Sequence, residues 1–267
     1  MKKTLLMAAL AAAVVGGALG CGGKDAADKA ASAADTAARQ PPSFSTFTDT
    51  RDGQVYKIVQ IGSQVWFAEN LNYAAKGSKC YNNSADSCEK YGRLYDRVTA
   101  LTACPAGYHL PYDDEWGTLV DYAGGATPLK TTTEWMYMPR IKIDFPERAG
   151  KFKFLTRWWR RKPVFNEYDL PGSPPGTDDY GFSALPAGYC GRAYDGSDDF
   201  GSAGRNAWWW TATDVYWAID IERGDTATNV YVRRMAYFHE IVDNELTNKS
   251  ETELYSVRCI RDEEAQK

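Results

Sequence analysis

Apolar residues recur with a helical spacing near the middle of the chain. They stand at i, i+3, i+4 and i+7, on one face of a helix, and they are Trp116, Leu119, Val120 and Ala123. Acidic residues at 113–115 suit the positive end of a helix dipole, and Gly124-Gly125 is typical of a helix end. We therefore expect a helix over about 113–123. Asp113 is its candidate N-cap, because Tyr112 stands where Ser or Thr would complete a capping box.

Turn-forming and β-branched residues predict two strand regions. Pro105 and Gly107 favour a tight turn, and Pro111 makes the residue before it extended, so a short strand should separate this turn from the helix. Nearer the N-terminus, residues 54–61 are rich in Val and Ile, and Gly62-Ser63 separates them from a similar run at 64–70. Two such runs joined by a glycine turn predict a β-hairpin.

A shorter helix is predicted before the turn, over residues 96–103. Asp96 can act as its N-cap, and Val98 and Leu101 share one face. The stretch between residues 80 and 88 has Tyr81 as its apolar anchor and is otherwise polar, so we expect a loop there.

The N-terminus has the pattern of a secretory signal. Lys2-Lys3 is followed by an apolar run at 5–19, which is too short to span a bilayer comfortably. Residues 18–21, Ala-Leu-Gly-Cys, resemble the lipobox of bacterial lipoproteins. That resemblance implies that residues 1–20 are removed and that Cys21 is lipidated, which would anchor the chain to a membrane. An ordinary signal peptide with a chance cysteine is the alternative. Gly22, in place of an aspartate, favours the outer membrane under the enterobacterial sorting rule.

Composition divides the rest of the chain into a tether and one main domain. Residues 22–43 lack large apolar side chains, so residues 21–43 are expected to form a lipid-anchored flexible tether. A content of 44 % hydrophobic residues in 267 is enough for one sizeable core, which we place at 44–262, with 263–267 as a tail. The net charge of -4 gives no general signal for polyanion binding.

The remaining cysteines fit an oxidising compartment. Five are left beyond the lipobox cysteine, an odd number. Cys80 and Cys88 flank the polar loop and are expected to form a local disulfide. Cys104 and Cys259 then form a long-range bridge, which leaves Cys190 unpaired. A metal site is not favoured, because the chain has no Cys-x-x-Cys pair and two histidines.

Several short motifs occur in order along the chain and together resemble one family. They are the hairpin segments 52–56, 61–66 and 68–72, the motifs 91–95, 104–105, 109–111 and 115–116, and the later segments 176–186, 209–213 and 256–262. In this order they resemble the Fibrobacter succinogenes major paralogous domain. The resemblance implies an α+β fold similar to C-type lectin-like domains and to the formylglycine-generating enzyme, with two short helices packed on an irregular antiparallel sheet. It implies no established catalytic residues.

The chain departs from this family pattern between about residues 136 and 175, where we expect an insertion. Residues 140–162 carry nine Lys or Arg against two acids, a local charge of +7. Aromatic residues alternate with these cations and could stack on sugars or contact an anionic envelope component. A surface loop with no binding role is the alternative. The candidate binding residues in this segment are Arg157, Trp158, Trp159, Arg160 and Arg161.

Trp208 and Trp209 are candidates for a sugar platform. In a strand, neighbouring tryptophans point to opposite faces, so one ring can be exposed while another enters the core. Calcium is an alternative cofactor at Asp178-Asp179 or at Asp195, Asp198 and Asp199, although turn chemistry explains these residues equally well.

Residues suited to catalysis are few. His109 and His239 are expected to be structural, and Cys190 lacks the paired cysteine on which the formylglycine-generating enzyme depends. We therefore expect a lipid-anchored envelope protein with a non-catalytic domain that binds carbohydrate or another surface partner. An enzyme or enzyme accessory on the same fold is the alternative, and the envelope address argues against nucleic acid.

Overall fold

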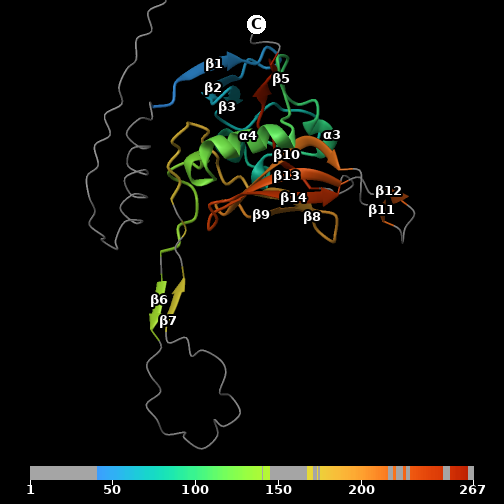
Figure 1. Ribbon diagram of the computed structural model, residues 1–267. Helices are drawn as coiled ribbons and strands as arrows, with labels where there is room; N and C mark the ends of the chain where they lie inside the picture. Colours follow the sequence, from blue (N-terminus) through green and yellow to red (C-terminus); the bar gives the residue numbers. More distant parts are fainter. Residues whose placement is uncertain are drawn as a thin grey trace, which may run out of the picture. The chain divides into compact units, whose positions relative to one another are not determined.

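The computed structural model describes residues 41–139, 141–144, 167–170, 173, 175–215, 219–220, 225–226, 229–248 and 253–263. The chain divides into two compact units, Met1–Gln40 and Pro41–Lys267, and the described residues lie in the second. This unit is α+β, with short helices packed against largely antiparallel sheets (Figure 1). No helix among the described residues is long and apolar enough to cross a membrane.

Among the residues that the structure describes, the helices are short and lie in the first half of the domain. They are α2 (Ala85–Tyr91), α3 (Arg97–Ala100) and α4 (Asp113–Ala123), with single 3₁₀ turns at Tyr81–Asn83 and Thr127–Leu129.

Two five-stranded sheets form the framework. The first has the order β1 (Phe44–Thr48), β2 (Val55–Ile61), β3 (Gln64–Phe67), β16 (Ile260–Arg261) and β5 (Tyr108–His109). The second has the order β14 (Val242–Asn248), β13 (Asn229–Ala236), β10 (Asn206–Val215), β15 (Tyr255–Ser256) and β4 (Leu94–Tyr95), in which β10 and β15 run parallel. The described residues also form three two-stranded pairs: β6 (Ile141–Asp144) with β7 (Glu167–Leu170), β8 (Tyr189–Arg192) with β9 (Asp198–Gly201), and β11 (Ile219–Asp220) with β12 (Asp225–Thr226).

The first sheet joins the two ends of the domain. The predicted hairpin is confirmed, with Ile61 opposite Gln64 across the turn. The C-terminal strand β16 lies between β3 and β5, so that Ile260 pairs with both Trp66 and His109. Residues that are far apart in the sequence therefore meet at this part of the sheet.

The helix α4 agrees with its sequence pattern. Trp116, Leu119 and Ala123 are buried in a core that also contains apolar residues of β2, β3, β10 and β13. Gly124 ends the helix with a φ of 78°, a conformation that glycine adopts at little cost. The predicted cap is wrong: the Asp113 carboxylate accepts from Arg233 at 2.7 Å, and Glu115 instead accepts from the backbone N–H that precedes the helix.

The prediction for residues 96–103 holds only at its start. Asp96 caps α3 by accepting from the Thr99 backbone N–H at 2.8 Å, but the helix ends at Ala100. The expected apolar face is reversed, since Val98 is 77 % and Leu101 48 % exposed. The Arg97 side chain lies inward because it pairs with the end of β10 at Asp214, 3.1 Å away.

Both predicted disulfides are confirmed. Cys80 bonds to Cys88 and Cys104 bonds to Cys259, while Cys190 is a buried free thiol. The segment between Cys80 and Cys88 is more ordered than the loop we predicted, because a 3₁₀ turn and the first half of α2 lie within it.

A fully buried arginine joins three segments of the core. Arg258 donates to the Asn70 side-chain oxygen at 2.8 and 3.1 Å, and to the backbone oxygens of Phe67 and Phe182 at 3.2 and 2.6 Å. Its guanidinium also lies 4.5 Å from the Phe182 ring centroid, and the same Asn70 oxygen accepts from the Trp209 indole at 2.9 Å. Burial lowers the pKa of Arg258 to about 9, so the group stays charged at neutral pH.

A second buried cation, Lys130, holds the turn between β13 and β14. Its ammonium donates to the backbone oxygens of Ala236 at 2.6 Å and His239 at 2.7 Å. The loss of hydration outweighs its electrostatic attraction to Glu240 and lowers the pKa of Lys130 to about 8.

Candidate functional site

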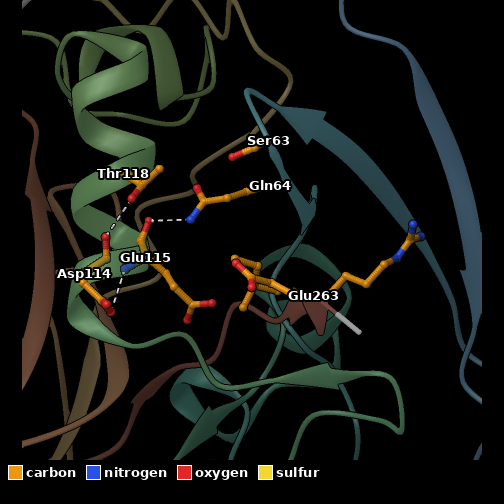
Figure 2. A pocket seen from close by; sticks show the side chains of 8 residues that line it. Ser63, Gln64, Asp114, Glu115, Thr118 and Glu263 are labelled. Carbon is orange, nitrogen blue, oxygen red and sulfur yellow. Dashed lines mark hydrogen bonds between the residues drawn. The ribbon is translucent and has the colours of Figure 1, made fainter. Parts of the chain in front are cut away.

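A polar cleft of about 370 Å³ lies where β3, α4 and the end of β16 meet (Figure 2). Ile260 contributes apolar surface. The polar lining consists of Ser63, Gln64, Asp114, Glu115, Thr118, Arg261 and Glu263. The cleft thus presents hydroxyl, amide, carboxylate and guanidinium groups within one concave surface.

Two hydrogen-bonded links fix the walls of this cleft. The Gln64 side chain donates to the backbone oxygen of Glu115 at 2.9 Å and accepts from the Trp66 indole at 3.1 Å. It therefore ties β3 to the first turn of α4. On the helix, the Thr118 hydroxyl donates to the backbone oxygen of Asp114 at 3.1 Å.

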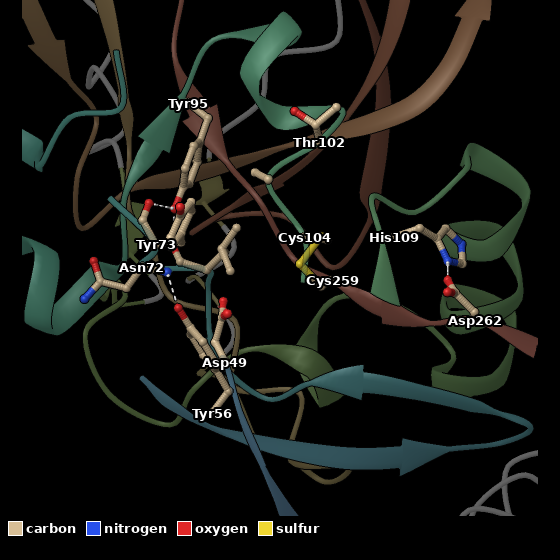
Figure 3. Close-up of a disulfide and its surroundings, with 12 residues drawn as sticks. Asp49, Tyr56, Asn72, Tyr73, Tyr95, Thr102, Cys104, His109, Cys259 and Asp262 are labelled. Atoms are coloured by element: carbon tan, nitrogen blue, oxygen red, sulfur yellow. Dashed lines mark hydrogen bonds and ion pairs between the residues drawn. A yellow bond between two sulfur atoms is a disulfide. The ribbon is translucent and has the colours of Figure 1, made fainter. Parts of the chain in front are cut away.

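The carboxylate of Glu115 is held from two directions. It accepts from the backbone N–H of Tyr112 at 2.7 Å. The Nε2 atom of His109 lies 3.0 Å from both Glu115 oxygens, and the Nδ1 atom lies 2.7 Å from Asp262. The bond to Glu115, followed by that to Asp262, raises the pKa of His109 against the effect of its partial burial. Figure 3 shows His109 and Asp262 facing each other beside the disulfide Cys104–Cys259.

Exposed tyrosine rings lie near both ends of α4. Tyr122, in its last turn, is 56 % exposed, and its ring lies over Gly62, where an added Cβ would come within 3.1 Å of it. Gly62 directly precedes Ser63 of the cleft. Tyr112, before the first turn, is 53 % exposed, with its ring centroid 6.0 Å from that of His109. Aromatic faces therefore stand beside the polar groups.

The tryptophans at 208–210 are less accessible than a sugar platform requires. Trp209 is fully buried and donates to Asn70, and Trp210 is also fully buried, so these rings offer no face to a ligand. Both faces of β10 are therefore covered at these two residues. The strand geometry alone predicted that neighbouring rings point to opposite faces, but not that both faces are buried. Trp208 is partly buried: it donates to Glu245 at 3.0 Å and packs against Tyr189 and Tyr255.

The other predicted binding and lipidation residues lie outside the described residues. They are Cys21, Arg157, Trp158, Trp159, Arg160 and Arg161.

The two acidic loops carry local hydrogen bonds. Asp178 accepts from the backbone N–H and the hydroxyl of Ser183, and Asp195 accepts from Ser197 in the same way. Asp198 pairs with Lys79. Within the described part of the chain, no group of three or more Asp, Glu, His or Cys residues could hold a metal ion.

The helical pattern and the turn motif predict structural roles for Glu115 and His109, but they do not indicate that Glu115 lines a cleft or that His109 contacts it. The partner of His109 is Asp262, 153 residues away, and no local pattern indicates that pairing. A cue was present: the motifs containing His109, Glu115 and Asp262 all belong to the set that carried the family resemblance.

Comparison with known proteins identifies one family. The model described as the Fibrobacter succinogenes major domain matches residues 59–261. No curated protein and no solved structure matches the chain.

Proposed function

The chain belongs to the Fibrobacter succinogenes major domain family, and on that premise we propose that it is a lipid-anchored envelope protein whose domain binds carbohydrate without catalysis. The observation that carries the proposal is the polar cleft between β3, α4 and β16. Sugars present many hydroxyl groups, each of which can donate and accept, and the cleft offers both kinds of partner in Gln64, Thr118 and the carboxylates.

The aromatic surroundings support this ligand class. Sugar rings have apolar faces that pack on aromatic rings, while their hydroxyl groups need polar partners. Tyr112 and Tyr122 supply exposed rings at the two ends of the helix that forms one wall of the cleft. A ligand extended along α4 would meet both kinds of surface.

The environment of the reactive side chains favours binding over catalysis. Both ring nitrogens of His109 are engaged by carboxylates, so the imidazole is not poised beside a nucleophile. The thiol of Cys190 is buried, and burial raises its pKa, which lowers the fraction of reactive thiolate.

A glycan array with the unit Pro41–Lys267 tests the binding proposal. We expect retention of specific oligosaccharides and its loss in Gln64→Ala and Glu115→Ala, each of which removes a polar partner from the cleft. Asp195→Asn, in the exposed β8–β9 turn, is the matched control and should bind as the parent does. Binding that survives both cleft substitutions would place the ligand elsewhere.

The membrane anchor is proposed from the sequence Ala18-Leu19-Gly20-Cys21. Inhibition of the lipoprotein signal peptidase with globomycin, or Cys21→Ser, should leave an unprocessed precursor. Normal maturation of that variant would refute the anchor without affecting the binding proposal.

The finer likeness to C-type lectin-like domains and the formylglycine-generating enzyme also remains a proposal. It is supported by the short helices packed against largely antiparallel sheets, the arrangement that the family resemblance implies. The basic segment 140–162 is proposed, from its sequence alone, to contact an anionic envelope component.

A further inference from the structure

The geometry around His109 requires two donated protons. A carboxylate lies within hydrogen-bond distance of each ring nitrogen, Asp262 at Nδ1 and Glu115 at Nε2. A neutral imidazole has one N–H and one lone pair, so it can donate to only one of two ionised carboxylates. The other carboxylate would then face a lone pair. The arrangement is therefore satisfied when the ring is doubly protonated and positively charged.

The three groups come from three separate elements. His109 lies in β5, Glu115 in the first turn of α4, and Asp262 directly after β16. Figure 2 shows the Glu115 side chain extending from the helix into the cleft, toward Glu263. The protonation state of His109 thus bears on a side chain that a ligand in the cleft would touch.

The other charged and titratable groups near the ring do not replace this contact. Tyr112 places its ring near His109, and its backbone N–H already donates to Glu115. In β16, Arg261 donates to the Tyr108 hydroxyl at 3.1 and 3.3 Å. If His109 lost its second proton and kept the one at Nδ1, which Asp262 accepts at 2.7 Å, the Tyr112 N–H would be left to orient Glu115.

We propose that His109 is a positioning residue for the cleft: its protonated ring holds Glu115 in the orientation that accepts ligand hydroxyl groups, so carbohydrate binds more tightly below the pKa of His109 than above it. This proposal rests on the proposed function for its ligand class. The proton-dependent position of Glu115 does not depend on that function and can be measured without a ligand. His109 holds the carboxylate of Glu115 and need not touch the sugar.

Nuclear magnetic resonance of the full-length chain in detergent micelles tests the positioning step. The chain contains two histidines, so the ring signals of His109 and His239 can be assigned by substituting each in turn. We expect the side-chain carboxyl signal of Glu115 to change with pH in step with the His109 ring. In His109→Gln, whose amide does not titrate in this range, that step should vanish. A Glu115 carboxyl signal that does not change as His109 titrates would overturn the proposal, whichever ligand the cleft binds.

Binding of cellohexaose and chitohexaose, followed by calorimetry from pH 5 to 9, tests the consequence. If either sugar binds, we expect about tenfold weaker affinity above the His109 pKa, which corresponds to a pKa change of about one unit upon binding. His109→Gln should bind with little pH dependence, and His239→Gln, the matched control, should keep the parent profile. A pH profile that is unchanged in His109→Gln would overturn the proposal. If neither sugar binds and the array is also negative, the proposed function fails while the Glu115 titration still decides the positioning step.

Discussion

Arg258 and His109 are two side chains near Cys259 of the long-range disulfide that can carry a positive charge. Their charges have different roles. Arg258 directly precedes Cys259 in the sequence. His109 pairs across the sheet with Ile260, which directly follows Cys259. The arginine is fully buried and donates to neutral oxygens, whereas the histidine is partly exposed and lies between two carboxylates. Separating a buried guanidinium from its hydrogen-bond partners costs much free energy. Its partners therefore fix how the core packs around it. Histidine has an ordinary pKa near neutral pH, and a partly exposed imidazole can therefore change its charge when the pH changes.

The disulfide near these two side chains should give the largest effect. In the chain-entropy account, a bridge that closes 155 residues stabilises by about 5 kcal/mol, and one that closes 8 residues by about 2.5 kcal/mol. We therefore expect the double variant Cys104→Ala/Cys259→Ala to lose about twice the unfolding free energy that Cys80→Ala/Cys88→Ala loses. Urea denaturation of both variants measures the ratio. Equal losses would show that the long bridge closes a segment that stays ordered in the unfolded chain.

Replacing the buried arginine comes next. Arg258→Met keeps much of the apolar stem but removes the guanidinium donor from the oxygens of Phe67, Phe182 and Asn70. The Asn70 oxygen keeps the Trp209 indole as a donor, and we expect a loss of about 3–5 kcal/mol. Arg261→Met, three positions away and partly exposed, is the matched control and should lose less than about 1 kcal/mol. Equal urea midpoints for the two variants would contradict the view that Arg258 organises the core.

Lys130 is a second buried cation, and its substitution tests whether it stabilises the fold, as Arg258 does, by donating to backbone oxygens. Lys130→Met removes the ammonium donor to the His239 oxygen and one of two donors to the Ala236 oxygen, which also accepts from the His239 backbone N–H at 3.2 Å, and it should cost about 2 kcal/mol at pH 7.

The pH dependence of this lysine has a defined sign. Its folded pKa of about 8 lies below its ordinary value of 10.5, so the unfolded chain binds more protons between these values. The stability difference between the parent and Lys130→Met should therefore grow as pH rises from 8 to 10.5, because a neutral amine still has two hydrogens for the two carbonyl oxygens. A difference that shrinks over this range would mean that the ammonium form is the stabilising one.

The contrast between Arg258 and His109 also explains what the sequence could predict. The stripe of α4 and the hairpin turn are local patterns, so Trp116, Leu119 and the pairing of Ile61 with Gln64 follow from spacing alone. The disulfides could be paired because the candidates were few and one pair was adjacent. Nothing in the local sequence around Arg258 indicates its burial, which depends on Asn70 and Phe182 from distant parts of the chain.

One local pattern gave the wrong answer because a tertiary contact overrides it. Val98 and Leu101 have the spacing of a buried face, yet the pairing of Arg97 with Asp214 turns the opposite face inward. The cleft was missed for a related reason: its walls come from β3, α4 and β16, and the insertion of β16 between β3 and β5 is a matter of topology that no short motif records.

The smallest effect on the free energy of unfolding should come from His109. The informative result is whether this effect rises or falls with pH. The folded pKa of His109 is raised above the ordinary value of 6.5, so the folded chain binds more protons than the unfolded chain as pH rises past 6.5. Its stabilising contribution is therefore complete below about pH 6.5 and is lost as pH rises through the folded pKa. Because the ring is 30 % exposed and its partners are partly solvated, we expect less than about 1 kcal/mol.

The measurement compares the parent with His109→Gln by urea denaturation at pH 5 and pH 9. The two should differ at pH 5 and converge at pH 9. If the unfolding free energies of the parent and His109→Gln differ by the same amount at both pH values, the ring stabilises the fold through packing alone. The charge of His109 would then make no contribution to stability.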